Sequence, residues 1–100
     1  RTIDLFGDGS VRLASTPGHS AGHQSVIVRL KERDMVIAGD AIFRESQLEA
    51  GADLPGLMHD EHNYRRSLQE VRLFRREYPE AVITPGHDTA FYENSPEKYE

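Results

Sequence analysis

TPGHSAGH occupies residues 16–23 of this 100-residue chain and stands between two apolar, strand-like runs. Pro17 fixes its own φ and favours an extended residue before it, while Gly18 and Gly22 permit backbone angles that other residues resist. We therefore predict a loop that is held in one irregular shape. Such a loop can aim the side chain of His19 in a fixed direction.

The phrase Thr-Pro-Gly-His returns at residues 84–87, again directly after an apolar run, and presents a second histidine by the same local device. Between the two phrases, the apolar run at residues 35–38 leads to Asp40. All three side chains lie next to predicted strands, at the rim of a sheet. Imidazole and carboxylate groups suit zinc, iron or manganese. His19, Asp40 and His87 are therefore the candidate metal ligands.

Three further polar residues lie close to this set. His23 stands four residues after His19, but Gly22 lies between them and the segment is not a helix face, so we expect His23 to orient the loop or to hydrogen-bond a ligand. Asp88 is a candidate acceptor that fixes the tautomer of a histidine ligand, and a turn aspartate is the equal alternative. His59 is interpreted as a capping or surface residue, although it ends a long loop, residues 41–59, that could carry it over a substrate pocket.

Strand-like segments dominate the first half of the chain. Short apolar runs bounded by turn or charged residues lie at residues 3–5, 11–13, 25–30, 35–38 and 81–83. The first two runs are expected to form a hairpin across a Gly-Asp-Gly-Ser turn. The third and fourth are expected to pair antiparallel across a charged turn.

One helix is predicted after the long loop. Asp60 is placed to cap its start, and apolar residues then recur at a spacing of three and four. These residues are Tyr64, Leu68, Val71, Phe74 and Tyr78. Pro79 is the stop signal, and the polar tail from Glu93 is expected to fray. The order of strands, loop, helix and strand predicts an α/β or α+β layered fold with the candidate ligands at one rim.

Composition limits the classes of partner. Hydrophobic residues make up 37% and charged residues 29%, which is typical of a globular protein, and there is no cysteine for disulfides or thiolate ligands. A formal net charge of -5 argues against nucleic acid, because phosphate binding requires a basic face. Arginines clustered between residues 65 and 76 are mixed with glutamates and indicate a solvated helix face. The apolar runs are far shorter than the roughly 20 residues of a membrane span, so we expect a cytoplasmic protein without a membrane partner.

Together these motifs resemble the metallo-β-lactamase superfamily. The matching segments are residues 16–25, the Gly-Asp-Ala at 39–41 and the Pro-Gly-His-Asp at 85–88. They are similar to the C-terminal half of that superfamily, and most similar to its N-acyl homoserine lactonases. The resemblance implies half of an αββα sandwich with mostly antiparallel strands and one main helix. It also implies hydrolysis of a small-molecule lactone or related acyl ester by metal-bound hydroxide.

The same resemblance assigns roles to the candidate ligands. It implies two zinc ions in the complete protein, with His19 on one ion, His87 on the other and Asp40 bridging both. Phe43 stands where the lactonases carry a tyrosine, and its ring can line a substrate pocket without donating a hydrogen bond.

The His-x-His-x-Asp-His motif of the superfamily's N-terminal half is absent from this sequence. We therefore expect the chain, which begins with Arg1, to be a piece of a longer protein and to be inactive alone. Half a sandwich would expose an apolar sheet face, so self-association or packing with the missing half is expected.

Other functions remain compatible with the motifs. Glyoxalase-II-like thioesterases share them. Two histidines and one carboxylate also form the ligand set of non-haem iron oxygenases, and the superfamily includes an iron-dependent persulfide dioxygenase branch. A folded scaffold without chemistry is the remaining alternative.

Overall fold

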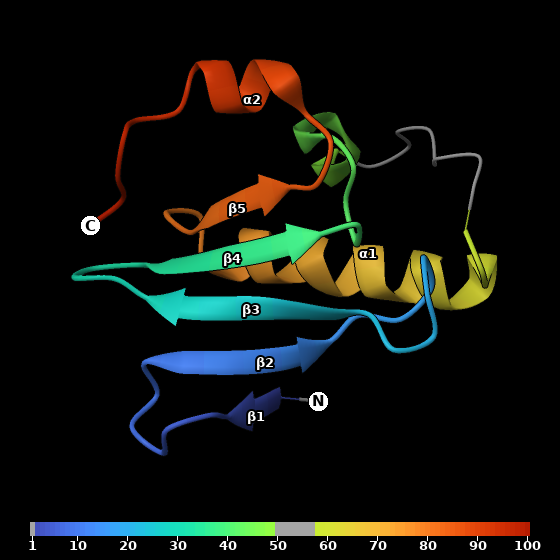
Figure 1. Cartoon of the computed structure of the whole chain (residues 1–100), viewed down its shortest axis with the longest axis horizontal. Helices are drawn as coiled ribbons and strands as arrows, with labels where there is room; N and C mark the ends of the chain where they lie inside the picture. The colour runs from blue at the N-terminus through green and yellow to red at the C-terminus, as the bar shows by residue number, and fades with distance from the viewer. Residues whose placement is uncertain (1, 50–57) are drawn as a thin grey trace.

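The computed structural model describes residues 2–49 and 58–100, which contain one five-stranded sheet (Figure 1). The strands are β1 (Thr2–Asp4), β2 (Val11–Ser15), β3 (Gln24–Arg29), β4 (Asp34–Gly39) and β5 (Val82–Pro85). Their order across the sheet is their order in the sequence. Strands β1 to β4 pair antiparallel, whereas β5 joins β4 in parallel. The fold is therefore α/β with a mixed sheet.

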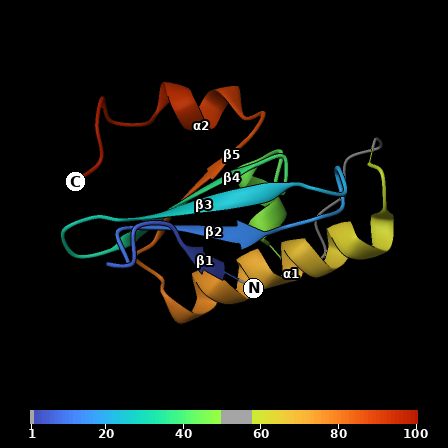
Figure 2. The same ribbon diagram turned by 60° about the horizontal axis from the view of Figure 1, so that its bottom comes forward.

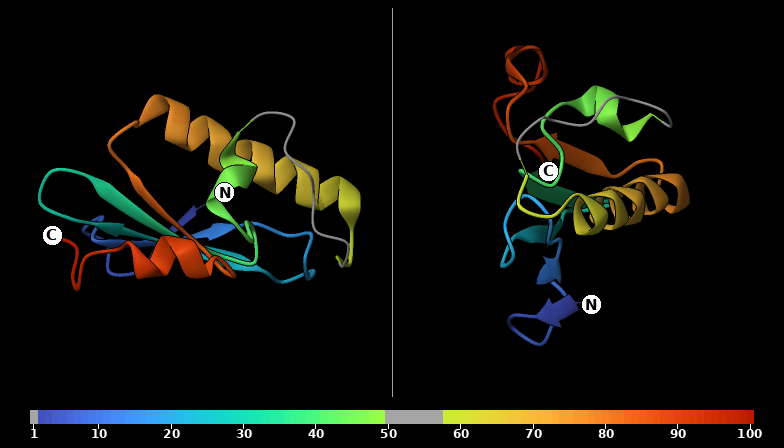
Figure 3. Two further views of the ribbon diagram at one scale, coloured as in Figure 1. Left: turned by 90° about the horizontal axis from the view of Figure 1, so that it is seen from above. Right: turned by 90° about the vertical axis from the view of Figure 1, so that its right-hand side faces the viewer.

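Three helical segments accompany the sheet: the 3-10 helix η1 (Glu45–Leu48), α1 (Glu61–Glu77) and α2 (Thr89–Glu93). The long helix α1 lies across one face of the sheet, and α2 lies beyond the β5 edge (Figure 2, Figure 3). A parallel pair such as β4 and β5 needs a crossover connection, and α1 supplies it. Both strands consequently finish at the same end of the sheet, beside the loop that joins β2 to β3 (Figure 1).

Helix α1 begins where the sequence predicts. The carboxylate of Asp60 accepts the backbone N–H of Asn63 at 3.1 Å and so satisfies one of the free N–H groups at the helix start. Tyr64, Leu68 and Val71 form the buried stripe, each at most 5% exposed. Their spacing of four and three residues places them on one helix face.

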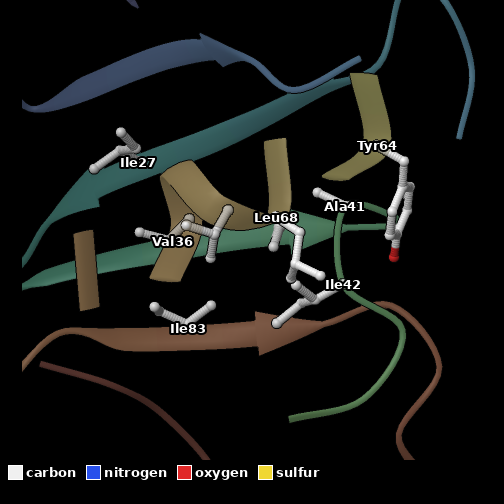
Figure 4. Close-up of a cluster of buried hydrophobic side chains, with 9 residues drawn as sticks. Ile27, Val36, Ala41, Ile42, Tyr64, Leu68 and Ile83 are labelled. Carbon is white, nitrogen blue, oxygen red and sulfur yellow. The ribbon is translucent and has the colours of Figure 1, made fainter. Parts of the chain in front are cut away.

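The stripe of α1 packs on the middle of the sheet to form the core (Figure 4). Ile27 lies opposite Val36, and Val36 lies opposite Ile83, so these three side chains form a row across β3, β4 and β5. Leu68 sits over this row together with Ile42 from the segment after β4. Burial of these apolar side chains holds α1 against the sheet and fixes the direction in which β4 and β5 present their ends.

The opposite face of the sheet carries a second apolar row. Ile3, Leu13, Val26 and Ile37 lie directly opposite one another on β1 to β4. Ile3 is 51% exposed and Ile37 is 44% exposed, while the two residues between them are half-buried. The sheet therefore has one covered face and one open apolar face.

Most predicted elements are present. The hairpin, the antiparallel pair and the capped helix are confirmed, and the fold class agrees with the prediction. Strand β5 runs farther than expected, so Thr84 and Pro85 of the second Thr-Pro-Gly-His phrase belong to the strand. Helix α2 was not predicted, and η1 lies in the segment expected to be loop. The rest of that loop, residues 50–57, lies outside the described residues.

The clustered arginines lie on α1 as expected. They are exposed except Arg72, which is half-buried and donates hydrogen bonds to the carbonyl groups of Gln47 at 2.8 Å and Glu49 at 2.9 Å. Arg72 thus fastens η1 to α1. Among the described residues, no helix combines the length and apolar character needed to cross a membrane.

Candidate metal centre

The three candidate ligands come together at the end of the sheet where β4 and β5 finish. His19 lies in the loop between β2 and β3, Asp40 follows β4, and His87 follows β5. The Nε2 atom of His19 lies 3.1 Å from one carboxylate oxygen of Asp40, and Nε2 of His87 lies 2.8 Å from the other. The carboxylate therefore lies between two imidazole rings, each of which faces a different oxygen.

Solvent reaches all three side chains. His19 is 31% exposed, Asp40 30% and His87 60%, so the cluster lies at a surface and can be reached by a small molecule. Within residues 2–49 and 58–100, however, no three histidine, aspartate or glutamate side chains are arranged to hold one ion. Each imidazole forms a separate pair with Asp40. The donor types fit zinc, but each pair supplies only two of the three protein ligands that a catalytic zinc ion has.

Helix α1 fixes the loop that carries His19. The backbone N–H groups of His59 and Asp60 donate to the carbonyl groups of His19 at 3.2 Å and Gly18 at 2.8 Å. The hydroxyl of Ser67 donates to the carbonyl of Pro17 at 2.7 Å. His59 is therefore next to His19 through its backbone, while its side chain is exposed. These contacts place the loop against the first turns of the helix.

Gly18 makes that close approach possible. Its φ of 141° lies in a region that side chains avoid, and a Cβ atom built there would lie 2.3 Å from the Cα of Tyr64. The loop backbone thus rests directly on the helix backbone.

Phe43 forms the apolar wall between the two histidines. Its ring packs edge-on to His19 with centroids 5.4 Å apart and lies tilted against His87 at 4.8 Å. The carbonyl of Phe43 accepts the backbone N–H of His87 at 2.9 Å, which fixes the two segments side by side. A substrate that reached Asp40 from this side would meet an aromatic ring without a hydroxyl.

Gln47 and Tyr64 support this wall from inside the protein, and sequence reasoning did not single out Gln47. Its Oε1 accepts the backbone N–H groups of Phe43 at 2.5 Å and Arg44 at 3.1 Å, and its Nε2 lies 3.3 Å from the hydroxyl of Tyr64. Burial raises the pKa of Tyr64, and the negative charge of Asp40 raises it further, against the hydrogen bond from Gln47. The buried glutamine has no motif around it, so its role depends on contacts that only the fold creates.

The contacts of Asp88 correspond to the alternative of a turn aspartate rather than to an acceptor for a histidine ligand. One of its carboxylate oxygens accepts the N–H of Phe91 at 3.1 Å and caps α2, and the other accepts the N–H of Glu45 at 2.9 Å. These two hydrogen bonds lower the pKa of Asp88, and the bond from Glu45 has the larger effect. Asp88 therefore joins the segment after His87 to the start of η1 instead of holding the imidazole of a ligand.

The side chain of His23 contacts the backbone of one candidate ligand, Asp40. Its Nδ1 lies 2.9 Å from the hydroxyl of Thr16, and its Nε2 accepts the backbone N–H of Asp40 at 3.1 Å. Both ring nitrogens are thus engaged by protein atoms.

Ser20 lies within a Gly-x-Ser-x-Gly pattern at residues 18–22. In serine hydrolases this pattern turns from a strand into a helix and exposes a nucleophile. Here it leads through turn residues into β3, and the carbonyl of Ser20 accepts the N–H groups of Gly18 and His23. The local structure is therefore a closed loop and not a nucleophile elbow.

Comparison with known proteins identifies the class. The profile of the metallo-beta-lactamase superfamily matches residues 1–87, and the chain belongs to that superfamily. Membership implies a metal cofactor.

Two relatives show which members of the superfamily are similar to this chain. The chain is 35% identical over 100 residues to the N-acyl homoserine lactonase AttM of Rhizobium radiobacter, an alignment that covers 96% of this chain and 37% of that protein. It is 30% identical to a probable metallo-hydrolase of Mycobacterium tuberculosis, covering 93% of this chain and 33% of that protein. The chain thus spans about a third of the length of these relatives.

A solved structure shows the same fold. It is an N-acyl homoserine lactone hydrolase with N-hexanoyl-L-homoserine bound at its catalytic metal center. The TM-score is 0.80 at 22% identity, over 95% of this chain and 36% of that one.

Proposed function

We propose that the protein carrying these residues is a metal-dependent hydrolase that opens a lactone or a related acyl ester. The observation that supports this most directly is the placement of His19 and His87 on the two oxygens of Asp40, at 3.1 Å and 2.8 Å. A carboxylate flanked in this way has the donor arrangement of a bridging ligand. The named activity of the AttM lactonase supports the choice of a lactone.

Zinc is the proposed metal, with two ions in the complete site and iron or manganese as alternatives that suit the same donors. His19 and Asp40 would hold one ion, and Asp40 and His87 the other. Bound zinc lowers the pKa of a water molecule toward neutrality and polarises a carbonyl group. Because each ion receives two ligands from the described residues, the remaining ligands must come from elsewhere. We therefore propose that these residues are the C-terminal part of the hydrolase domain and do not turn over substrate alone.

The open face of the sheet supports the same proposal. The row from Ile3 to Ile37 places apolar side chains side by side on an uncovered sheet face, and such faces usually pack against other protein rather than water. We propose that the rest of the hydrolase domain covers it. Sedimentation of the chain as a stable dimer would instead indicate that a second copy covers this face.

A segment exchange tests the function. The matching segment of the AttM lactonase is replaced with these 100 residues, and zinc content, circular dichroism and lactone opening are measured. We expect a folded protein that binds zinc and opens N-acyl homoserine lactones. His87→Ala should abolish turnover, whereas His62→Ala, at an exposed histidine on the first turn of α1, should leave it unchanged.

Three outcomes contradict the proposal in different ways. A folded exchange protein without zinc would indicate a silent scaffold. Cleavage of thioesters in preference to lactones would indicate a thioesterase. Iron content with oxygen consumption on a persulfide would indicate the oxygenase.

A further inference from the structure

His23 lies inside a chain of hydrogen bonds that ends at Asp40. A backbone N–H can only donate, so Nε2 of His23, 3.1 Å from the backbone nitrogen of Asp40, must carry a lone pair. The neutral ring then has its proton on Nδ1, which donates to the hydroxyl of Thr16 at 2.9 Å. The hydrogen-bond geometry thus assigns the tautomer of the neutral ring.

The same direction continues beyond Thr16. Its hydroxyl lies 2.9 Å from the hydroxyl of Ser25, which in turn donates to the carbonyl of Ala38 at 3.4 Å. A carbonyl oxygen only accepts, so Ser25 donates to Ala38, and its own oxygen is left to accept from Thr16. The hydroxyl of Thr16 then accepts from Nδ1 of His23, which agrees with the direction assigned from Asp40. Thr16 is 4% exposed and Ser25 is 1% exposed, so little water competes for these groups.

This chain connects the elements that carry two candidate ligands. Thr16 and His23 bound the loop that presents His19, and the N–H of Thr16 donates to the carbonyl of His23 at 3.0 Å to close it. Ser25 lies on β3, and Ala38 lies on β4 just before Asp40. One imidazole therefore joins the His19 loop to the backbone of the shared carboxylate.

Gly39 provides the room for the ring. Its φ is 53°, and a Cβ atom built on it would lie 3.2 Å from Nε2 of His23. The glycine lets the backbone turn at the end of β4 so that the N–H group of Asp40 points toward the imidazole.

We propose that His23 is a positioning residue that sets the place of Asp40 by accepting its backbone N–H in the Nδ1-protonated tautomer. The role of Asp40 as a metal ligand rests on the proposed function, but the hydrogen bonds of His23 do not depend on a bound ion. His23 has both nitrogens engaged and binds no metal itself. Loss of the acceptor would release the backbone of Asp40 and move its carboxylate away from the two Nε2 atoms.

Three substitutions test the contacts of the two ring nitrogens separately. In His23→Gln the side-chain amide reaches the position of Nε2 and can still accept the N–H of Asp40. In His23→Asn the amide reaches only the position of Nδ1, so the contact with Thr16 is retained and the acceptor for Asp40 is lost. His23→Ala removes both. A residue that only filled space would make the asparagine and glutamine variants behave alike.

The first readout is made on the metal-free chain by nitrogen NMR and amide exchange. We expect the neutral ring of His23 to carry its proton on Nδ1 and none on Nε2. The Asp40 amide should exchange at least about tenfold faster in the asparagine and alanine variants than in the wild type, and should stay protected in the glutamine variant. A ring protonated at Nε2, or an Asp40 amide with the same exchange in all variants, would overturn the inference.

The second readout is zinc affinity by calorimetry on the exchange proteins described above that carry the same three substitutions. Partners that orient ligands typically contribute about 10–100-fold to metal affinity, so His23→Asn should lose that factor and His23→Gln should keep most of it. Equal affinity in the two variants would overturn the role in positioning. A wild-type exchange protein that binds no zinc would count against the proposed metal site, while the NMR result decides the His23 inference separately.

Discussion

Gly18 is the point at which the His19 loop rests on α1, and replacing it with alanine tests how this contact positions the site. The added Cβ would lie 2.3 Å from the Cα, 2.4 Å from the nitrogen and 2.6 Å from the Cβ of Tyr64. Two of these atoms are helix backbone and cannot rotate away. The loop or the helix must move, although three hydrogen bonds to residues 17–19 hold them together.

The magnitude follows from two contributions. A φ of 141° at a residue with a side chain costs about 1–3 kcal/mol, and forcing extra volume into a packed contact costs about 1–3 kcal/mol more. The sum of about 2–6 kcal/mol is a large part of the roughly 5–15 kcal/mol that stabilises an ordinary domain. At about 4–8 °C per kcal/mol for a chain of this size, the melting temperature should fall by more than about 8 °C.

Thermal and urea unfolding, followed by circular dichroism, measure this change. Gly22→Ala is the matched control, because it lies in the same loop with no heavy atom within 4 Å of the added Cβ. We expect that control to change the free energy of unfolding by less than about 1 kcal/mol. If Gly18→Ala unfolds with the same midpoint as Gly22→Ala, the close packing of loop and helix is wrong.

Three further substitutions test other parts of the account. A Cβ on Gly86 would lie 2.6 Å from a carboxylate oxygen of Asp40, so Gly86→Ala should weaken zinc binding by at least about tenfold in calorimetry; unchanged affinity would contradict the placement of Asp40. Leu68→Ala, at 1% exposure in the core, should lower the free energy of urea unfolding by about 2–5 kcal/mol, and a loss below about 1 kcal/mol would show that α1 does not pack there. The hydrogen bond from the backbone of Asn63 lowers the pKa of Asp60 in the folded protein. The stabilisation by this cap is therefore present at pH values above 3.8, the ordinary pKa, and is lost as the pH falls through the lower pKa of the folded state. The difference in melting temperature between wild type and Asp60→Ala should therefore shrink in acid, and a constant difference from neutral pH to pH 2 would contradict a charged cap.

Local signals in the sequence predicted much of the fold. The alternation at residues 11–13 and the apolar run at 35–38 identified strands, and the cap at Asp60 with its apolar spacing identified α1. These features depend on residues that are close in the sequence, so they can be predicted without the structure. The five-residue helix α2 was missed because it is too short to show a periodic pattern.

Contacts between distant residues could not be predicted in the same way. The sequence placed His19, Asp40 and His87 near strand ends, but their pairing through the two oxygens of Asp40 depends on the parallel pairing of β4 and β5. Asp88 shows the limit, since its partner Glu45 is 43 residues away and no local pattern connects them. Gln47 likewise gains its role only when α1 brings Tyr64 to it.

Zinc content tests the central claim most directly. Elemental analysis is made after dialysis against zinc on the exchange protein in which these 100 residues replace the matching segment of the AttM lactonase, on its double variant His19→Ala, His87→Ala, and on its His62→Ala variant as the control. We predict zinc in the wild type and the control, and its loss in the double variant. Equal zinc in all three proteins, or zinc in none of them, would contradict a metal centre built by His19, Asp40 and His87.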